Sequence, residues 1–235
     1  MSEADFPPVV KPRRRWYQYS LRSLLLVMLL ASLGMSWVAT QREKARRQRE
    51  AVEAILKLHG TVYYDYQVDA AGKPVQTARP PVATWWRRLL GDDFFDRVVY
   101  VQVPSDAALE PVEQLPDLQT LELGCNYAIT DAGLERLRCL SRLDFLHLRG
   151  TQVTTAGAAK LADMPQLRSL ELGNPDMTDA DLKYLTRLTQ LQSLDLRSCT
   201  RLTDAAVQKL RQALPAYYIQ PTPANGQGGD DPFGG

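Results

Sequence analysis

One histidine and three carboxylates recur along the chain at nearly equal spacing. Each stands between two leucines of an L-x-L motif, 24 or 25 residues from the next, at Glu122, His147, Glu171 and Asp195. Imidazole and carboxylate groups suit zinc or manganese, so this set could in principle bind a divalent cation. The set has only one histidine, and neighbouring strands would hold its side chains several ångström apart. We therefore expect no metal site and no cofactor.

Two further sets of residues flank this one with the same spacing. One contains Thr120, Phe145, Ser169 and Ser193, and the other contains Gly124, Arg149, Gly173 and Arg197. A partner's basic segment could bind the acids, with Phe145 as an apolar anchor and the two arginines setting its register. Solvated side chains without a ligand are the alternative. The candidate binding residues are Glu122, His147, Glu171, Asp195, Phe145, Arg149 and Arg197.

Sequence signals for catalysis are sparse. The chain has no GxSxG, phosphate-loop, HExxH or dinucleotide-binding motif. Its only histidines are His59 and His147. Repeated units also leave few irregular loops in which a Ser-His-Asp arrangement could form. We therefore predict a protein that is not an enzyme and has no small-molecule substrate.

The elements that must position the candidate residues are four copies of one pattern, within residues 115–214. The copies begin LQTLELGCNYAITDAGLERL, LDFLHLRGTQVTTAGAAKL, LRSLELGNPDMTDADLKYL and LQSLDLRSCTRLTDAAVQKL. A fixed period in the twenties with L-x-x-L-x-L spacing is the signature of a leucine-rich repeat. We predict an α/β solenoid with parallel strands on its concave face and helices on its convex face.

Each unit continues from its strand into a predicted helix. The helix N-cap is expected at a threonine, Thr130, Thr154, Thr178 or Thr203, usually followed by an acid that suits the helix dipole. Two residues after each threonine stands an alanine, Ala132, Ala156, Ala180 or Ala205. We expect these small side chains to let the helix lie close to the strands.

The repeat domain is predicted to cover residues 98–220. A shortened first unit starts at the strand RVVYVQV, and AYYIQP reads as a closing strand. In the cap region, 61–97, we expect a strand over Thr61–Val68 and an aromatic cluster, Trp85, Trp86, Leu89 and Leu90, that closes the repeat core or, alternatively, touches a membrane. Residues 221–235 are rich in proline and glycine, which predicts disorder.

Residues 21–40 predict a transmembrane helix. Ser23 to Gln41 contains 19 residues without a charge, enough to cross a hydrocarbon core of roughly 30 Å. Lysine and arginine are nearly balanced on its two sides. We expect a signal anchor with a basic cytoplasmic segment at 1–20 and extracytoplasmic repeats. A cleaved signal peptide is the alternative, because Gly34 and Ser36 offer small residues for cleavage.

Residues 41–60 predict a juxtamembrane helix that ends at Gly60. Its charges suit a solvated stalk or, alternatively, contact with anionic lipid head groups.

The net charge of the chain, +1, conceals two different parts. Residues 1–50 hold ten basic against four acidic side chains, whereas 51–235 hold eighteen against twenty-three. An acidic repeat domain argues against a nucleic-acid partner, because phosphate binding needs a basic face. The three cysteines, Cys125, Cys139 and Cys199, lack zinc-site spacing, and we expect buried thiols.

Two resemblances add to this interpretation. LELGCNYAITDAGL and LDLRSCTRLTDAAV resemble the cysteine-containing leucine-rich repeat of F-box ubiquitin-ligase receptors. The start RRRWYQYSLRSLLLVMLL, the YYDYQ strand and RRLLGDDFF resemble membrane-anchored leucine-rich-repeat proteins of planctomycete-type bacteria. The first resemblance implies the repeat fold and protein binding, and the second implies a membrane-anchored architecture. We therefore predict a membrane-anchored scaffold for protein recognition, with an intracellular adaptor or a structural envelope protein as alternatives.

Overall fold

The computed structural model describes residues 21–69, 72–75, 78, 80, 87, 95–214 and 218–221. The chain divides into two compact units, Met1–Arg42 and Glu43–Gly235. Three predictions lie outside the described residues: the basic segment 1–20, the aromatic cluster of Trp85, Trp86, Leu89 and Leu90, and the tail after Pro221.

The first element is one long helix, α1 (Leu21–Lys57). Within the described residues, it is the helix that is long and apolar enough to cross a membrane, with a mean hydropathy of 1.9 in its most apolar window. None of that window is buried in protein. A membrane anchor and a signal sequence near the amino terminus satisfy the same criterion.

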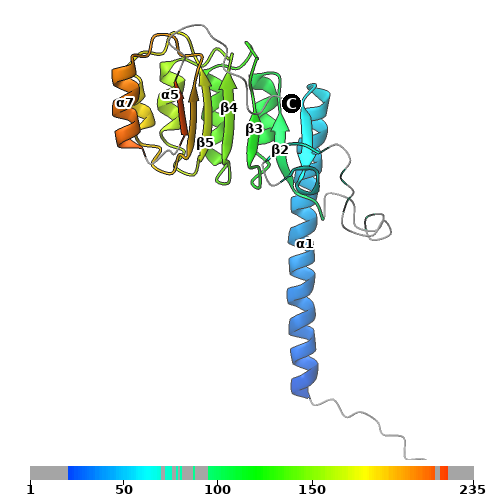
Figure 1. Cartoon of the computed structure of the whole chain (residues 1–235). Helices are drawn as coiled ribbons and strands as arrows, with labels where there is room; N and C mark the ends of the chain where they lie inside the picture. Colours follow the sequence, from blue (N-terminus) through cyan, green and yellow to red (C-terminus); the bar gives the residue numbers. More distant parts are fainter. Residues whose placement is uncertain are drawn as a thin grey trace, which may run out of the picture. The chain divides into compact units, whose positions relative to one another are not determined.

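The second unit is built on one sheet whose strands follow chain order (Figure 1). The strands are β1 (Thr61–Tyr64), β2 (Val98–Gln102), β3 (Thr120–Glu122), β4 (Phe145–Arg149), β5 (Ser169–Gly173), β6 (Ser193–Leu196) and β7 (Tyr218–Pro221). From β2 to β7 all neighbours are parallel, which confirms the predicted parallel sheet, and β1 is antiparallel to β2.

The strand predicted over Thr61–Val68 is shorter than expected, because it ends at Tyr64. The Gln67 side chain accepts a hydrogen bond from the Tyr64 backbone N–H at 3.0 Å, and this turns the chain into the 3-10 helix η1 (Asp65–Gln67). Local side-chain hydrogen bonds of this kind compete with continued strand pairing.

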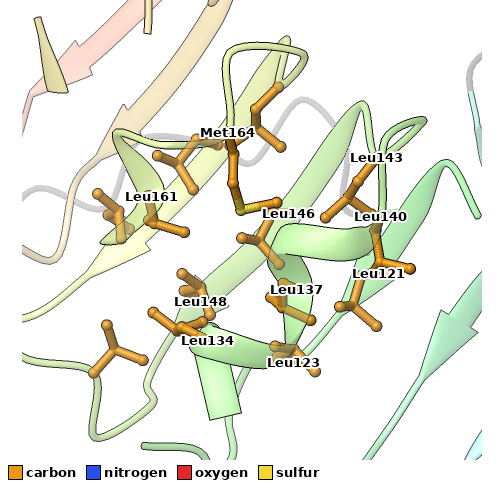
Figure 2. Close-up of a cluster of buried hydrophobic side chains, with 14 of the residues drawn as sticks. Leu121, Leu123, Leu134, Leu137, Leu140, Leu143, Leu146, Leu148, Leu161 and Met164 are labelled. Carbon is orange, nitrogen blue, oxygen red and sulfur yellow. The ribbon is translucent and has the colours of Figure 1, made fainter. Parts of the chain in front are cut away.

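Short helices connect the parallel strands. They are η3 (Asp106–Ala108), α3 (Leu109–Val112), α4 (Asp131–Arg136), η4 (Leu137–Cys139), α5 (Thr155–Leu161), α6 (Leu182–Leu185) and α7 (Asp204–Ala213). The two L-x-L leucines of every repeat strand are at most 2% exposed and pack against apolar residues of the helices. Figure 2 shows this core, where Leu121, Leu146 and Leu148 of the strands meet Leu134 and Leu137.

The apolar face of the second half of α1 is part of the repeat core, while the charged side chains of Arg46, Arg47 and Arg49 are exposed. Ala51, Val52 and Ile55 are at most 9% exposed and belong to the buried cluster. The Gln48 side chain donates to the carbonyl of Asp96 at 2.9 Å and accepts from the N–H of Val98 at 3.4 Å. A solenoid needs its first unit closed, and this helix closes it.

The end of α1 is shaped for that contact. His59 has the left-handed φ of 62°, and the N–H of Gly60 donates to the carbonyl of Ile55 at 2.9 Å. A Cβ on Gly60 would lie 2.5 Å from Cγ2 of Ile55, so glycine is required there for packing. The helix thus ends close to Gly60, as predicted. The residue with the left-handed backbone conformation is His59, however, and not the glycine.

Hydrogen bonds from a threonine of one repeat to an aspartate of the repeat before it connect consecutive units. Asp106 accepts from both the N–H and the hydroxyl of Thr130, at 3.0 and 2.5 Å. The same pair of hydrogen bonds joins Thr154 to Asp131 and Thr203 to Asp179. The hydrogen bonds from Thr203 hold the pKa of Asp179 below its ordinary value. The sequence pattern predicts only a helix-dipole role for Asp131 and Asp179 and does not single out Asp106.

One step of this Asp–Thr ladder is different. The unit before Thr178 has Thr155 where the others have aspartate. Thr178 instead donates its N–H and hydroxyl to Asp181 of its own unit, at 2.8 and 2.6 Å. It is therefore not the N-cap that we predicted, because α6 begins only at Leu182. Thr130, Thr154 and Thr203 do cap their helices.

We expect Thr155→Asp to complete the ladder and stabilise the repeat unit. The gain should be below about 1 kcal/mol, because hydrogen bonds at solvated sites contribute modestly. Urea unfolding of the full chain in detergent measures it, and Thr155→Asn, which lacks the charge, is the matched control. A Thr155→Asp chain no more stable than the asparagine variant would contradict the expectation.

The predicted role of the alanines is wrong. Ala132, Ala156, Ala180 and Ala205 are all exposed. The close approach occurs one residue later, because a Cβ on Gly133 or Gly157 would lie 2.3 or 2.2 Å from the ladder aspartate of the preceding unit. The helix therefore turns its glycine, and not its alanine, toward the previous repeat.

The prediction of three buried thiols is right only for Cys199, whose thiol donates to the carbonyl of Leu172 at 3.7 Å. Cys125 and Cys139 are exposed. Cys125 lies in a turn after β3 with φ of 58°, and Cys139 ends the 3-10 helix η4, so neither occupies an inward position.

Candidate functional site

The sheet register assembles the predicted residues on the face opposite the buried leucines, which we call the open face. Its middle row contains Gln102, Glu122, His147, Glu171, Asp195 and Gln220. Its aromatic row contains Tyr100, Thr120, Phe145, Ser169, Ser193 and Tyr218. Arg149 pairs with Gly173, and side-chain alternation adds Gly124 and Arg197 to this arginine row.

His147 lies between two carboxylates of the middle row. Its Nδ1 is hydrogen-bonded to Oε1 of Glu122, and its Nε2 is 3.4 Å from Oε2 of Glu171. The side chains of His147 and Glu122 are 18% and 19% exposed. A Cβ on Gly124 would lie 2.4 Å from Cε1 of His147, so the glycine provides the space that the ring occupies.

The charge of His147 is stabilised by these neighbours. Burial alone would lower the pKa of His147, but the hydrogen bond to Glu122 and the charges of Glu122 and Glu171 outweigh burial and the nearby Arg149, so the pKa is raised. The raised pKa means that protonated His147 stabilises the fold. That contribution is complete below the ordinary histidine pKa and is lost as the pH rises through the raised value.

We expect Glu122→Gln to lower the pKa of His147, because it removes the charged hydrogen-bond partner. The pH range in which the fold loses stability should move downward with it. Two-dimensional NMR of the imidazole resonances across pH measures this directly, and Glu135→Gln on the helix side is the control. An unchanged His147 titration in the Glu122→Gln chain would refute the assignment.

Glu171 is the least compensated acid of the middle row. Burial raises its pKa, His147 and Arg197 oppose the rise, and the charges of Asp195 and Glu122 add to it. Arg197 is committed elsewhere, because its Nη2 and Nε lie 2.7 and 2.9 Å from Oδ2 of Asp195. Glu171 is left with the 3.4 Å approach of His147, and its side chain is 29% exposed.

Arg149 is the complementary case, an exposed cation on β4. It makes no ion pair with any residue in the described ranges. A Cβ on Gly173 would lie 2.6 Å from its Cγ and 2.9 Å from its Cα. The arginine stem therefore crosses over Gly173, and this glycine is buried beneath it.

Three residues of the open face have roles that the sequence pattern does not predict. Gly124 and Gly173 are members of the predicted rows, but the space that they provide for His147 and Arg149 is seen only in the structure. Tyr100 continues the aromatic row onto β2 and meets Tyr63 of β1 edge to face, with ring centroids 5.3 Å apart. Burial, Glu122 and Tyr63 raise the pKa of Tyr100 to about 12, so it is a neutral hydrogen-bond donor. Aligning RVVYVQV with the L-x-L strands would have found it.

The seven candidate residues all lie on the open face, but they do not form one site. His147 joins Glu122 and Glu171, Asp195 joins Arg197, and Phe145 and Arg149 stand apart. Among the described residues, no group of three or more His, Cys, Asp or Glu side chains is arranged to hold a metal ion. A depression of about 390 Å³ lies between α6 and α7, and none of its lining residues belongs to the open face.

Comparison with known proteins identifies the repeat type in two segments of the chain. Residues 114–137 and 187–210 match the family model described as Leucine Rich repeat. These two segments therefore carry leucine-rich repeats. The first contains β3 and α4, and the second contains β6 and α7 as far as Leu210. No curated protein sequence matches the chain.

Solved structures with similarity include two bacterial proteins. An internalin from Listeria monocytogenes is 26% identical over 46% of this chain and 36% of its own, with a TM-score of 0.34. A protein from Bacteroides fragilis is 17% identical over 49% of this chain and 37% of its own, with a TM-score of 0.35. The chain spans a little over a third of the length of each structure.

Proposed function

We propose that this chain is a non-catalytic scaffold that recognises a protein partner through the open face of its repeats. The observation that carries the proposal is a group of three side chains on one face of the sheet, Phe145, Glu171 and Arg149. Among the described residues, the only close polar contact of Glu171 is the 3.4 Å approach of His147, and Arg149 makes no ion pair. Charged and aromatic side chains that are weakly paired in the described part of the chain are available to a partner. Repeat arrays supply extended surfaces suited to such contacts.

Site-specific photo-crosslinking tests this function. A photoreactive amino acid at position 145 lies on the open face, and the same amino acid at position 187, exposed after α6, is the control. In native membranes we expect a discrete adduct at 145 that disappears when Glu171→Lys is added. Equal adducts at both positions, or an adduct at 187 alone, would count against the open face.

We further propose that residues 21–40 anchor the chain in a membrane and place the repeats outside the cytoplasm. The apolar window of α1 supports the anchor, because none of it is buried in protein. Resistance to extraction at alkaline pH is the expected result, and release into the soluble fraction would favour an adaptor or a cleaved signal. The intact mass of the mature chain separates these two.

The exposed thiols provide a test of orientation. Cys125 and Cys139 are exposed and Cys199 is buried, so the first two should react with a membrane-impermeant maleimide in intact cells if the repeats are extracytoplasmic. Labelling only after permeabilisation would place the repeats in the cytoplasm. The Cys125→Ser/Cys139→Ser chain is the control, because it retains only the buried thiol.

A further inference from the structure

We infer that the open face binds an extended segment of a partner protein whose alternate side chains are apolar, basic and acidic, in that order across the three rows. The inference rests on the proposed function and specifies the chemistry of the partner. It differs from a purely basic partner, which the sequence alone suggested, because the structure shows that most acids of the middle row already have cationic neighbours.

The seam between β4 and β5 presents one side chain of each kind. In the aromatic row Phe145 pairs with Ser169, in the middle row His147 pairs with Glu171, and in the arginine row Arg149 pairs with Gly173. The small partners Ser169 and Gly173 leave Phe145 and Arg149 standing above their neighbours. Along the seam, the side chains offered to a partner are therefore the apolar Phe145, the acidic Glu171 and the basic Arg149, in that order.

The middle row of this seam favours a cation. Glu122 is hydrogen-bonded to His147 and Asp195 is ion-paired with Arg197, whereas Glu171 has only the longer, 3.4 Å contact with Nε2 of His147. The charges of Asp195 and Glu122 further disfavour the charge of Glu171. A lysine or arginine of the partner would compensate Glu171 by a charge-assisted hydrogen bond.

The arginine row favours an anion. Arg149 is exposed and, within the described part of the chain, makes no ion pair. The stem of Arg149 lies over Gly173 of β5. The planar guanidinium group can donate hydrogen bonds to both oxygens of a carboxylate. An aspartate or glutamate of the partner fits this position.

Spacing connects the three contacts into one binding mode. Residues 145, 147 and 149 are alternate residues of one strand, so the rows are about 6.6 Å apart at 3.3 Å per residue. An extended peptide repeats its side chains at the same interval. Alternate side chains of a segment lying along the seam therefore reach Phe145, Glu171 and Arg149 in turn, in either chain direction.

Paired peptides of identical composition test the inference. One carries leucine, lysine and glutamate at alternate positions, and the other has the lysine and glutamate exchanged. Each is made in both chain directions, and affinity for the full chain in detergent is measured by fluorescence anisotropy. The first peptide should form two ion pairs with the open face, where the second places like charges together. We therefore expect the chain to bind the first peptide at least about fivefold more tightly.

A charge exchange in the protein should reverse that preference. We expect the Glu171→Lys/Arg149→Glu chain to prefer the second peptide. The Arg138→Glu/Asp163→Lys chain exchanges an ion pair of 2.8 Å on the helix side without altering the net charge, and its preference should stay native. Thermal unfolding confirms that the variants fold.

Equal affinity for the two orders, binding of neither peptide up to about 1 mM, or an unreversed preference would overturn the inference. If crosslinking at position 145 still occurs, only this partner chemistry fails and the proposed function stands. If crosslinking is also absent, both fail.

Discussion

Ile55→Ala should lower the free energy of unfolding of the repeat unit by about 2–5 kcal/mol, because it removes buried methyl groups and leaves a cavity. Ile55 is 0% exposed, lies in the core cluster and contacts Gly60 at the end of α1. The second half of α1 is thus expected to be a structural cap of the repeats.

The neighbouring residue provides a matched control for this substitution. Leu56 is 53% exposed on the same helix, so Leu56→Ala removes a side chain of equal size from a solvated position. We expect it to change stability by less than about 0.5 kcal/mol. Urea unfolding of both variants, followed by circular dichroism of the full chain in detergent, measures the difference. Equal losses in the two variants would show that the helix does not cap the core.

Gly173→Ala should cost about 1–3 kcal/mol, because the added methyl group would overpack the seam of β4 and β5. It would lie 2.9 Å from Cα of Arg149, which is backbone and cannot rotate away, and 2.6 Å from Cγ of the same residue. The arginine should be displaced from its position. We therefore expect weaker binding of the leucine, lysine and glutamate peptide as well as lower stability.

Gly124→Ala is the comparison for this prediction. The three atoms nearest to its added methyl group all belong to the imidazole of His147, which can rotate aside. Its stability loss should be smaller, and its main effect should be a lower pKa of His147, because the ring leaves Glu122. Unfolding in urea and the NMR titration of His147 measure both variants. A larger stability loss for Gly124→Ala than for Gly173→Ala would contradict this account.

Several features of this protein could be predicted from the sequence because they depend on local repetition. A repeat of 24 or 25 residues requires each unit to pack in the same way on the one before it. Side-chain alternation then fixes which residues face outward. The seven candidate residues and the order of the strands followed from these two rules.

The helix around Ile55 shows the limit of such rules. Val52, Ile55 and Leu56 are all apolar, and nothing local says which of them meets the repeats. Burial of Val52 and Ile55, with Leu56 exposed, depends on where β2 places the edge of the core. The Asp–Thr ladder has the same origin, because its hydrogen bonds join residues 23 or 24 positions apart.

The sequence by itself therefore determined the repeat architecture, the apolar helix and the rows of the open face, since each depends on periodicity or composition within one unit. Only the tertiary structure decided how the charges in those rows are paired. Arg197 pairs with Asp195, two residues earlier, whereas the stem of Arg149 crosses Gly173 of the next strand and, among the described residues, makes no ion pair. The direction that each arginine takes depends on how its side chain packs, and the periodicity of the chain is identical for both arginines.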